Sequence, residues 1–129
     1  MSAFTELDIL HFFEKMPDVF PIYQALEDAI CAAFDPVEIT VQKTQIAFSN
    51  RRRFAFASLP VRRLKGWPAV CLVVTFGLTY RLDSPRVAQA VEPCPNRWTH
   101  HVLLTDPAQA DAELLGWLAA SYALSAAKR

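Results

Sequence analysis

Apolar residues in the first quarter of the chain recur every three or four positions, the spacing that gives an α-helix one buried face. The pattern predicts a short helix that begins near Thr5 and ends before Pro17. A second helix is predicted from Asp18, its expected N-cap, with Pro21 in the first turn, where a missing N–H costs nothing. The Asp-Pro pair at 35–36 stops this helix.

The pattern then changes to the alternation of period two that is typical of strands. Segments 37–41, 46–48 and 53–58 alternate in this way. Segment 69–78 is a nearly continuous apolar run, which predicts a central strand that is buried on both faces. A fifth strand is predicted over 98–104.

Alternation within the third strand predicts which side chains share a face of the sheet. Phe54 and Phe56 are expected on one face, opposite Arg53, Ala55 and Ala57.

Two further segments carry helix-start signals. Ser84-Pro85 predicts a short helix that ends near Val91, and Asp106-Pro107 predicts the start of a long C-terminal helix. Strands joined by short connections favour antiparallel pairing. The expected fold class is therefore α+β, an antiparallel sheet of about five strands with N-terminal and C-terminal helices on one face. Residues 1–129 are expected to form a single domain.

Composition narrows the kinds of site that the chain can hold. Only three glycines are present, which excludes a glycine-rich phosphate loop, and three cysteines without CxxC spacing favour neither disulfides nor zinc. The N-terminus is acidic where a signal peptide would be basic, and the longest apolar stretch, 68–78, is too short to span a bilayer. We expect a cytoplasmic protein with no membrane contact, no metal and no cofactor.

The charges are divided by segment, although the formal net charge is zero. Residues 1–42 carry one basic and eight acidic side chains, net −7, whereas residues 43–101 carry ten basic and two acidic ones, net +8. Such a division can become a basic face after folding, and a basic face concentrates anionic ligands.

The basic segment predicts a binding site for an anionic small molecule on the sheet, in a binding domain rather than an enzyme. Arginine presents a fork of donors that matches carboxylate and phosphate. The two adjacent histidines fall on opposite faces of the fifth strand, so they cannot chelate one metal together. The candidate binding residues are Lys43, Arg53, Arg86, Arg97, His100 and His101.

Three other interpretations remain open. The charges near residues 51–53 equally fit a solvated turn or the protection of an edge strand. The same surface, extended by Arg51, Arg52, Arg62 and Arg63, could bind nucleic acid, and an enzyme could use His100 or His101. The oligomeric state is undetermined, a homodimer included.

Several motifs resemble a family of bacterial domains of unknown function, family 5655. They are KTQIAF at 43–48 with RRF at 52–54, LDSPR at 82–86, and RWTHHV at 97–102 followed by ELLGWL at 113–118. The resemblance covers nearly the whole chain. It implies a small α+β protein, distantly similar to the YdhG and YjbR type, and it implies no activity.

Overall fold

The computed structural model describes residues 3–50, 52–60, 67–68 and 70–127. The helices in this part of the chain are α1 (Ala3–Phe12), α2 (Phe20–Ala33) and α3 (Ala112–Ala127), with 3₁₀ helices η1 (Pro17–Val19) and η2 (Pro107–Gln109) before α2 and α3. The strands are β1 (Glu38–Val41), β2 (Ile46–Ser49), β3 (Arg53–Ser58), β4 (Leu72–Leu78), β5 (Val87–Cys94) and β6 (Arg97–Leu104).

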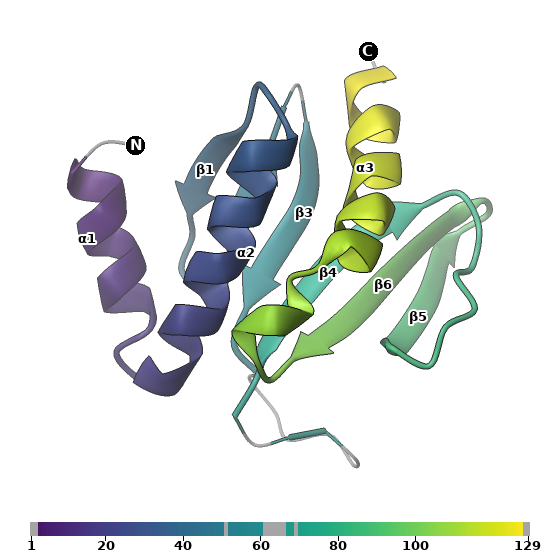
Figure 1. Ribbon diagram of the computed structural model, residues 1–129. Helices are drawn as coiled ribbons and strands as arrows, with labels where there is room; N and C mark the ends of the chain where they lie inside the picture. The colour runs from purple at the N-terminus through teal and green to yellow at the C-terminus, as the bar shows by residue number, and fades with distance from the viewer. Residues whose placement is uncertain (1–2, 51, 61–66, 69, 128–129) are drawn as a thin grey trace.

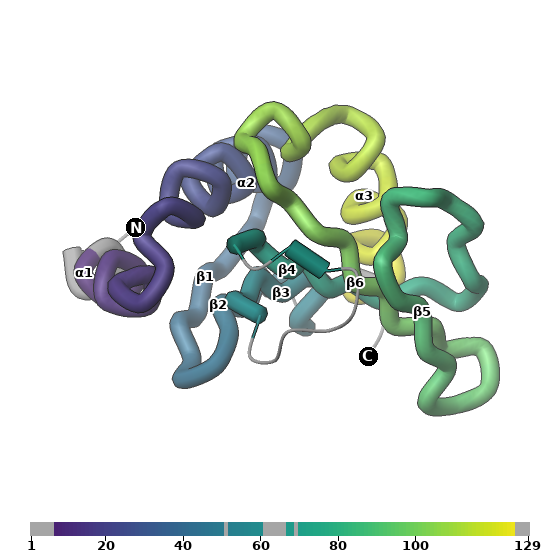
Figure 2. Tube along the Cα trace, turned by 90° about the horizontal axis from the view of Figure 1, so that it is seen from below, coloured from purple at the N-terminus to yellow at the C-terminus, as the bar shows by residue number. Residues whose placement is uncertain are grey.

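The strands form one antiparallel sheet in the order β1-β2-β3-β4-β6-β5 (Figure 1). Helices α2 and α3 lie on the same side of this sheet, and α1 lies beside its β1 edge, as the view along the strands shows (Figure 2). The predicted α+β class is confirmed. None of the described helices is long and apolar enough to cross a membrane.

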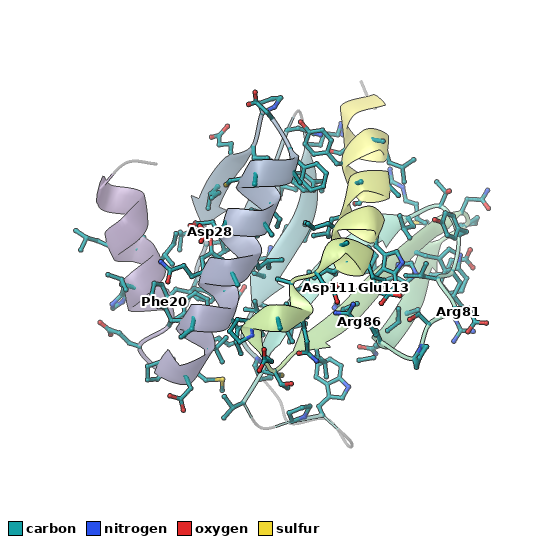
Figure 3. The ribbon with its side chains drawn as sticks, viewed as in Figure 1. Phe20, Asp28, Arg81, Arg86, Asp111 and Glu113 are labelled. Carbon is teal, nitrogen blue, oxygen red and sulfur yellow. The ribbon has the colours of Figure 1, made fainter. Side chains whose placement is uncertain are left out.

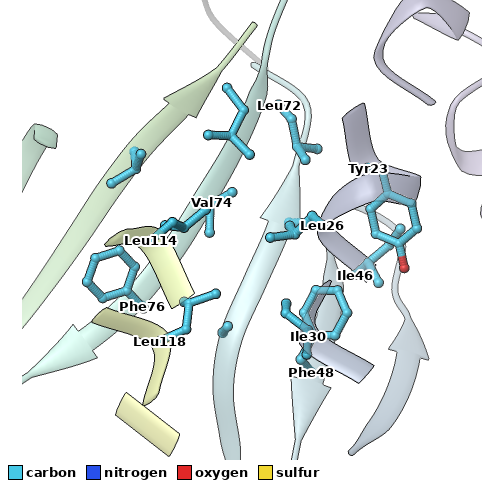
Figure 4. Packing of buried hydrophobic residues seen from close by; sticks show 14 of the residues in the cluster. Tyr23, Leu26, Ile30, Ile46, Phe48, Leu72, Val74, Phe76, Leu114 and Leu118 are labelled. Atoms are coloured by element: carbon cyan, nitrogen blue, oxygen red, sulfur yellow. The ribbon is translucent and has the colours of Figure 1, made fainter. Parts of the chain in front are cut away.

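The hydrophobic core lies between the helices and the sheet (Figure 4). Helix α2 contributes Tyr23, Leu26 and Ile30, and α3 contributes Leu114 and Leu118. Alternate strand residues face them, namely Ile46 and Phe48 of β2, Leu72, Val74 and Phe76 of β4, and Val102 and Leu104 of β6. Helices α2 and α3 therefore bury the apolar stripes that their sequence periods predict, whereas Leu7 and Leu10 of the first helical region, expected to face the core, are exposed.

Helix starts differ from the predicted ones by a few residues. Asp18 lies in η1, and α2 begins at Phe20 without a side-chain cap, although Pro21 does occupy its first turn. Asp106 caps η2, where its Oδ1 accepts from the Ala108 N–H at 2.8 Å, and α3 begins only at Ala112.

The short helix predicted after Ser84 is wrong, because this segment leads into β5, a sixth strand. The Ser84 Oγ accepts from the Arg86 N–H at 3.2 Å, so the predicted cap closes a turn instead. Beyond that turn, edge strand β5 gains a ladder of backbone hydrogen bonds with β6, which a seven-residue helix cannot match. Pro93 is tolerated because β5 pairs on one side only.

The β5–β6 hairpin turns through Pro95 and Asn96, between the paired residues Cys94 and Arg97. Asn96 has a φ of 62°, the left-handed region that asparagine and glycine tolerate best. We therefore predict that Asn96→Ala lowers the free energy of unfolding by about 1 kcal/mol. Asn96→Gly should leave it unchanged or raise it. Urea denaturation of the three proteins measures this, and equal stability of the alanine and glycine variants would contradict the prediction.

Candidate anion-binding site

The candidate site begins with one extra residue in β3. Phe48 of β2 pairs with Ala55, but the next residue, Ser49, pairs with Arg53, so Phe54 has no partner on β2. Such a β-bulge brings two consecutive side chains toward the same side. Phe54 and Ala55 are accordingly both buried in the core, and the predicted strict alternation along this strand is wrong.

The bulge also separates β3 from β4 at one end of the sheet. The two strands pair only from Ala55 opposite Phe76 to Ser58 opposite Val73. Strand β4 continues to Leu78, where its remaining neighbour is β6. The space beside Gly77 and Leu78 is therefore not closed by a ladder to β3.

Helix α3 holds the separated end of β3 in place. The Ser121 Oγ donates to the Phe54 carbonyl oxygen at 2.7 Å. The Asn50 Nδ2 donates to the Tyr122 carbonyl oxygen at 3.0 Å, and the Ser125 Oγ lies 2.9 Å from both the Asn50 Oδ1 and the Arg52 carbonyl oxygen. These bonds tie the β2–β3 turn to the second half of α3.

A pocket of about 330 Å³ occupies this end of the sheet. Among the described residues, its lining includes Arg52, Arg53 and Arg97 and no aspartate or glutamate. The aromatic side chains of Phe56 and Trp98 contribute apolar surface. The site is thus a small hollow with a positively charged rim.

The strand register places Arg53 and Arg97 on the open face of the sheet, away from the helices. Arg53 pairs with Ser49, one residue after the core residue Phe48. Arg97 precedes Trp98 and shares its face with Thr99 and His101. Both arginines are exposed, and within the described residues neither guanidinium forms an ion pair or hydrogen bond. Their strands flank β4 in the sheet order.

The other four predicted residues lie elsewhere. Lys43 is exposed in the connection between β1 and β2, at the opposite end of β2 from the Asn50 turn. Arg86 lies beneath the first turn of α3 (Figure 3). The structure therefore brings Arg53 and Arg97 into one pocket and leaves the remaining predicted residues outside its lining.

Arg86 is already engaged by the protein. One terminal nitrogen, Nη1, lies 2.9 Å from the Asp111 Oδ1 and 2.9 Å from the Glu113 Oε1, and Nη2 donates to the Gln109 carbonyl oxygen at 2.8 Å. The guanidinium carbon also lies 5.7 Å from the centre of the Trp117 ring. Partial burial alone would lower the pKa of Arg86, but its hydrogen bonds to Asp111 and Glu113 raise it. Arg86 fastens the 79–86 connection to α3.

The two histidines occupy different environments, on opposite faces as predicted. His100 is fully buried, stacks on Phe76 with 5.2 Å between ring centres, and accepts the Leu82 N–H at its Nε2 at 2.9 Å. His101 is half-buried on the open face, where its Nδ1 lies 2.9 Å from the Thr75 Oγ1. Burial lowers the pKa of both imidazoles.

Some pocket features were not singled out by the sequence patterns. Gly77 looks like part of an apolar run, although a glycine inside a strand often marks a place where another group approaches the backbone. Asn50 looks like an ordinary turn residue, and no local signal reveals its bonds to α3. In the described part of the chain, no group of three or more His, Cys, Asp or Glu residues is placed to hold a metal ion.

The structure has the α+β fold that the resemblance of the sequence motifs implied. The model of the family described as Domain of unknown function (DUF5655) matches residues 11–125. The match covers most of the chain, so the protein belongs to this family. No curated protein and no solved structure matches the chain.

The lowered pKa values of His100 and His101 predict a loss of stability in mild acid. In the unfolded chain a histidine has a pKa of about 6.5, above the lowered pKa of the folded state, so unfolding takes up protons below that pH. The free energy of unfolding should therefore fall as the pH drops from about 6.5 to 5. Asp111, whose pKa is lowered mainly by Arg86 from an ordinary value of 3.8, contributes its own loss only at lower pH.

Denaturation at several pH values between 5 and 7 measures the slope of the free energy of unfolding against pH. NMR titration of the ring protons measures the two pKa values directly. We expect His100→Gln and His101→Asn each to reduce the slope. An unchanged slope in the double variant, or midpoints at or above 6.5 in the parent protein, would contradict the prediction.

Proposed function

We propose that this protein is a binding domain that holds a small anionic molecule between Arg53 and Arg97. The observation that carries the proposal is that these two guanidinium groups, unpaired within the described residues, border one pocket to whose lining the described part of the chain contributes no carboxylate. A bound carboxylate or phosphate would offset the mutual repulsion of the two cations and accept hydrogen bonds from both. The pocket volume lies near the lower end of small-molecule sites, roughly 300–1,000 Å³.

The surroundings of the histidines support binding rather than catalysis. A general base needs a partner that orients it and access to the reacting group. The His100 Nε2 is occupied by the Leu82 N–H inside the core, and His101 contacts the Thr75 hydroxyl rather than a carboxylate. Neither imidazole lines the arginine pocket.

Nucleic-acid binding is the second candidate, favoured by Phe56 and Trp98 beside the arginines, where a base could stack. Salt separates the two functions, because each phosphate contact adds to the salt dependence of the affinity. The affinity for a single-stranded oligonucleotide held by the surface should fall steeply as the salt concentration rises. The affinity for a small ligand with one negative charge should fall only slightly. No measurable oligonucleotide binding at 20 mM salt would exclude this candidate.

Further predictions from the sequence accompany the proposal. We infer a cytoplasmic, single-domain protein of bacterial origin with a distant similarity to the YdhG and YjbR type, and we leave a homodimer open. These inferences rest on the composition and motifs described above.

The proposal predicts that inorganic phosphate binds at Arg53 and Arg97. Phosphate is titrated into the full-length protein at low ionic strength while the arginine Nε–H signals are followed by NMR. Arg53→Gln and Arg97→Gln should each weaken binding by roughly ten- to hundredfold, the worth of a charge-assisted hydrogen bond. Lys43→Gln is the matched control, since it removes one exposed charge outside the pocket, and it should bind as the parent does.

Two results would overturn the proposal. One is a change in the NMR signals that does not saturate with phosphate and is of similar size in Lys43→Gln and the two arginine variants. Such a change indicates that phosphate screens the surface charges in general and binds no particular site. The other is unchanged binding but lowered stability in the arginine variants, which assigns these side chains a structural role instead.

A further inference from the structure

The pocket contains a channel that the arginines do not explain. On the open face, Gly77 of β4 pairs with Thr99 of β6, and Thr75 of β4 pairs with Phe56 of β3. These four residues all line the pocket. Because Gly77 has no side chain, the surface beside Phe56 and Thr99 is left open near the end of β4, in the pocket that Arg53 and Arg97 also line.

The space above Gly77 would accept a side chain. A Cβ built on this residue would lie 3.8 Å from the Trp98 carbonyl oxygen, an ordinary contact. Glycine weakens the interior of a strand, and a residue with a Cβ would fit here. A bound ligand provides a reason for keeping this space empty.

The hydroxyls that line the pocket are not equally available to a ligand. Those of Ser121 and Ser125 are used in bonds to β3 and the β2–β3 turn, and that of Thr75 lies against His101, which leaves those of Thr79 and Thr99. On the open face the aromatic surface of the pocket comes from Phe56, whereas Trp98 pairs with the core residue Leu78 and lies on the helix side of the sheet. A compact inorganic ion would fill only the charged rim, whereas a flat apolar group would fill the channel as well.

We propose that the natural ligand is an aromatic carboxylate, with its carboxylate between Arg53 and Arg97 and its ring over Gly77 against Phe56. This inference rests on the anion-binding function proposed above and adds the chemical class of the ligand. Burial of the ring supplies the affinity, and the two arginines orient the carboxylate.

Three probes separate the contributions of the ring and of the charge to the affinity. Benzoate carries both the ring and the charge, acetate carries the charge alone, and benzyl alcohol carries the ring alone. Each is titrated into the full-length protein and followed by NMR. Benzoate should bind about ten- to hundredfold more tightly than acetate, which corresponds to burying one aromatic ring. Benzoate should also bind more tightly than benzyl alcohol. Arg97→Gln should weaken the binding of both benzoate and acetate.

Gly77→Val tests the channel without touching the arginines. Valine favours a strand, so the melting temperature should be unchanged or higher. Its methyl groups would occupy the channel, so benzoate binding should fall to the level of acetate, while acetate binding stays as in the parent. Gly116→Ala, on the exposed side of α3 with open space around it, is the control for adding a side chain elsewhere.

The outcomes distinguish this inference from the proposed function. If benzoate binds no better than acetate, or Gly77→Val leaves benzoate binding intact, the aromatic class is wrong and anion binding stands. If no anion perturbs Arg53 or Arg97, both proposals fail. If benzyl alcohol binds as tightly as benzoate, the arginines do not select the ligand, and the anionic class is overturned.

Discussion

Strand β3 contains one more residue than β2 can pair with, and the site depends on where that residue goes. The bulge carries Phe54 into the core, where its ring lies 4.9 Å from that of Tyr122 on α3. The same change moves Arg53 to the open face and ends the ladder between β3 and β4 at Ala55. Bonds from Ser121 and Ser125 of α3 attach this end of β3 and the preceding turn to the helix. Packing against α3 therefore determines the pocket at this end of the sheet, whose lining includes Ser121, Leu124 and Ser125 of that helix.

The positive charge of the middle segment is divided among different tasks. Arg86 is held by two carboxylates and an aromatic ring, so it joins the 79–86 connection to α3. Lys43 lies in a turn at the far end of β2. Only Arg53 and Arg97, of the six predicted residues, line the pocket. A net charge counted along a segment overstates the charge available to a ligand, because salt bridges neutralise part of it and strand topology spreads the rest.

The errors in the predicted elements have a common cause. Ser84-Pro85 carries a genuine local signal, and the Ser84 cap forms, but the chain then continues as β5 because β6 offers an unpaired edge. Pro95-Asn96 is a turn signal of equal strength between two strands, and its significance depends on knowing that Val87–Cys94 is one of them. Local preferences are worth tenths of a kcal/mol to about 1 kcal/mol per residue, and pairing with a neighbouring strand outweighs them.

The sequence by itself determined the α+β class, both terminal helical regions, five of the six strands, and the opposite orientation of His100 and His101. Each of these follows from a period of apolar residues, which depends on the nearest neighbours along the chain. The tertiary structure decided the strand order, the bulge at Phe54 and the meeting of Arg53 with Arg97. Those features arise from pairing between strands and from long-range contacts such as that of Ser121 with Phe54, 67 positions apart, and no local period encodes them.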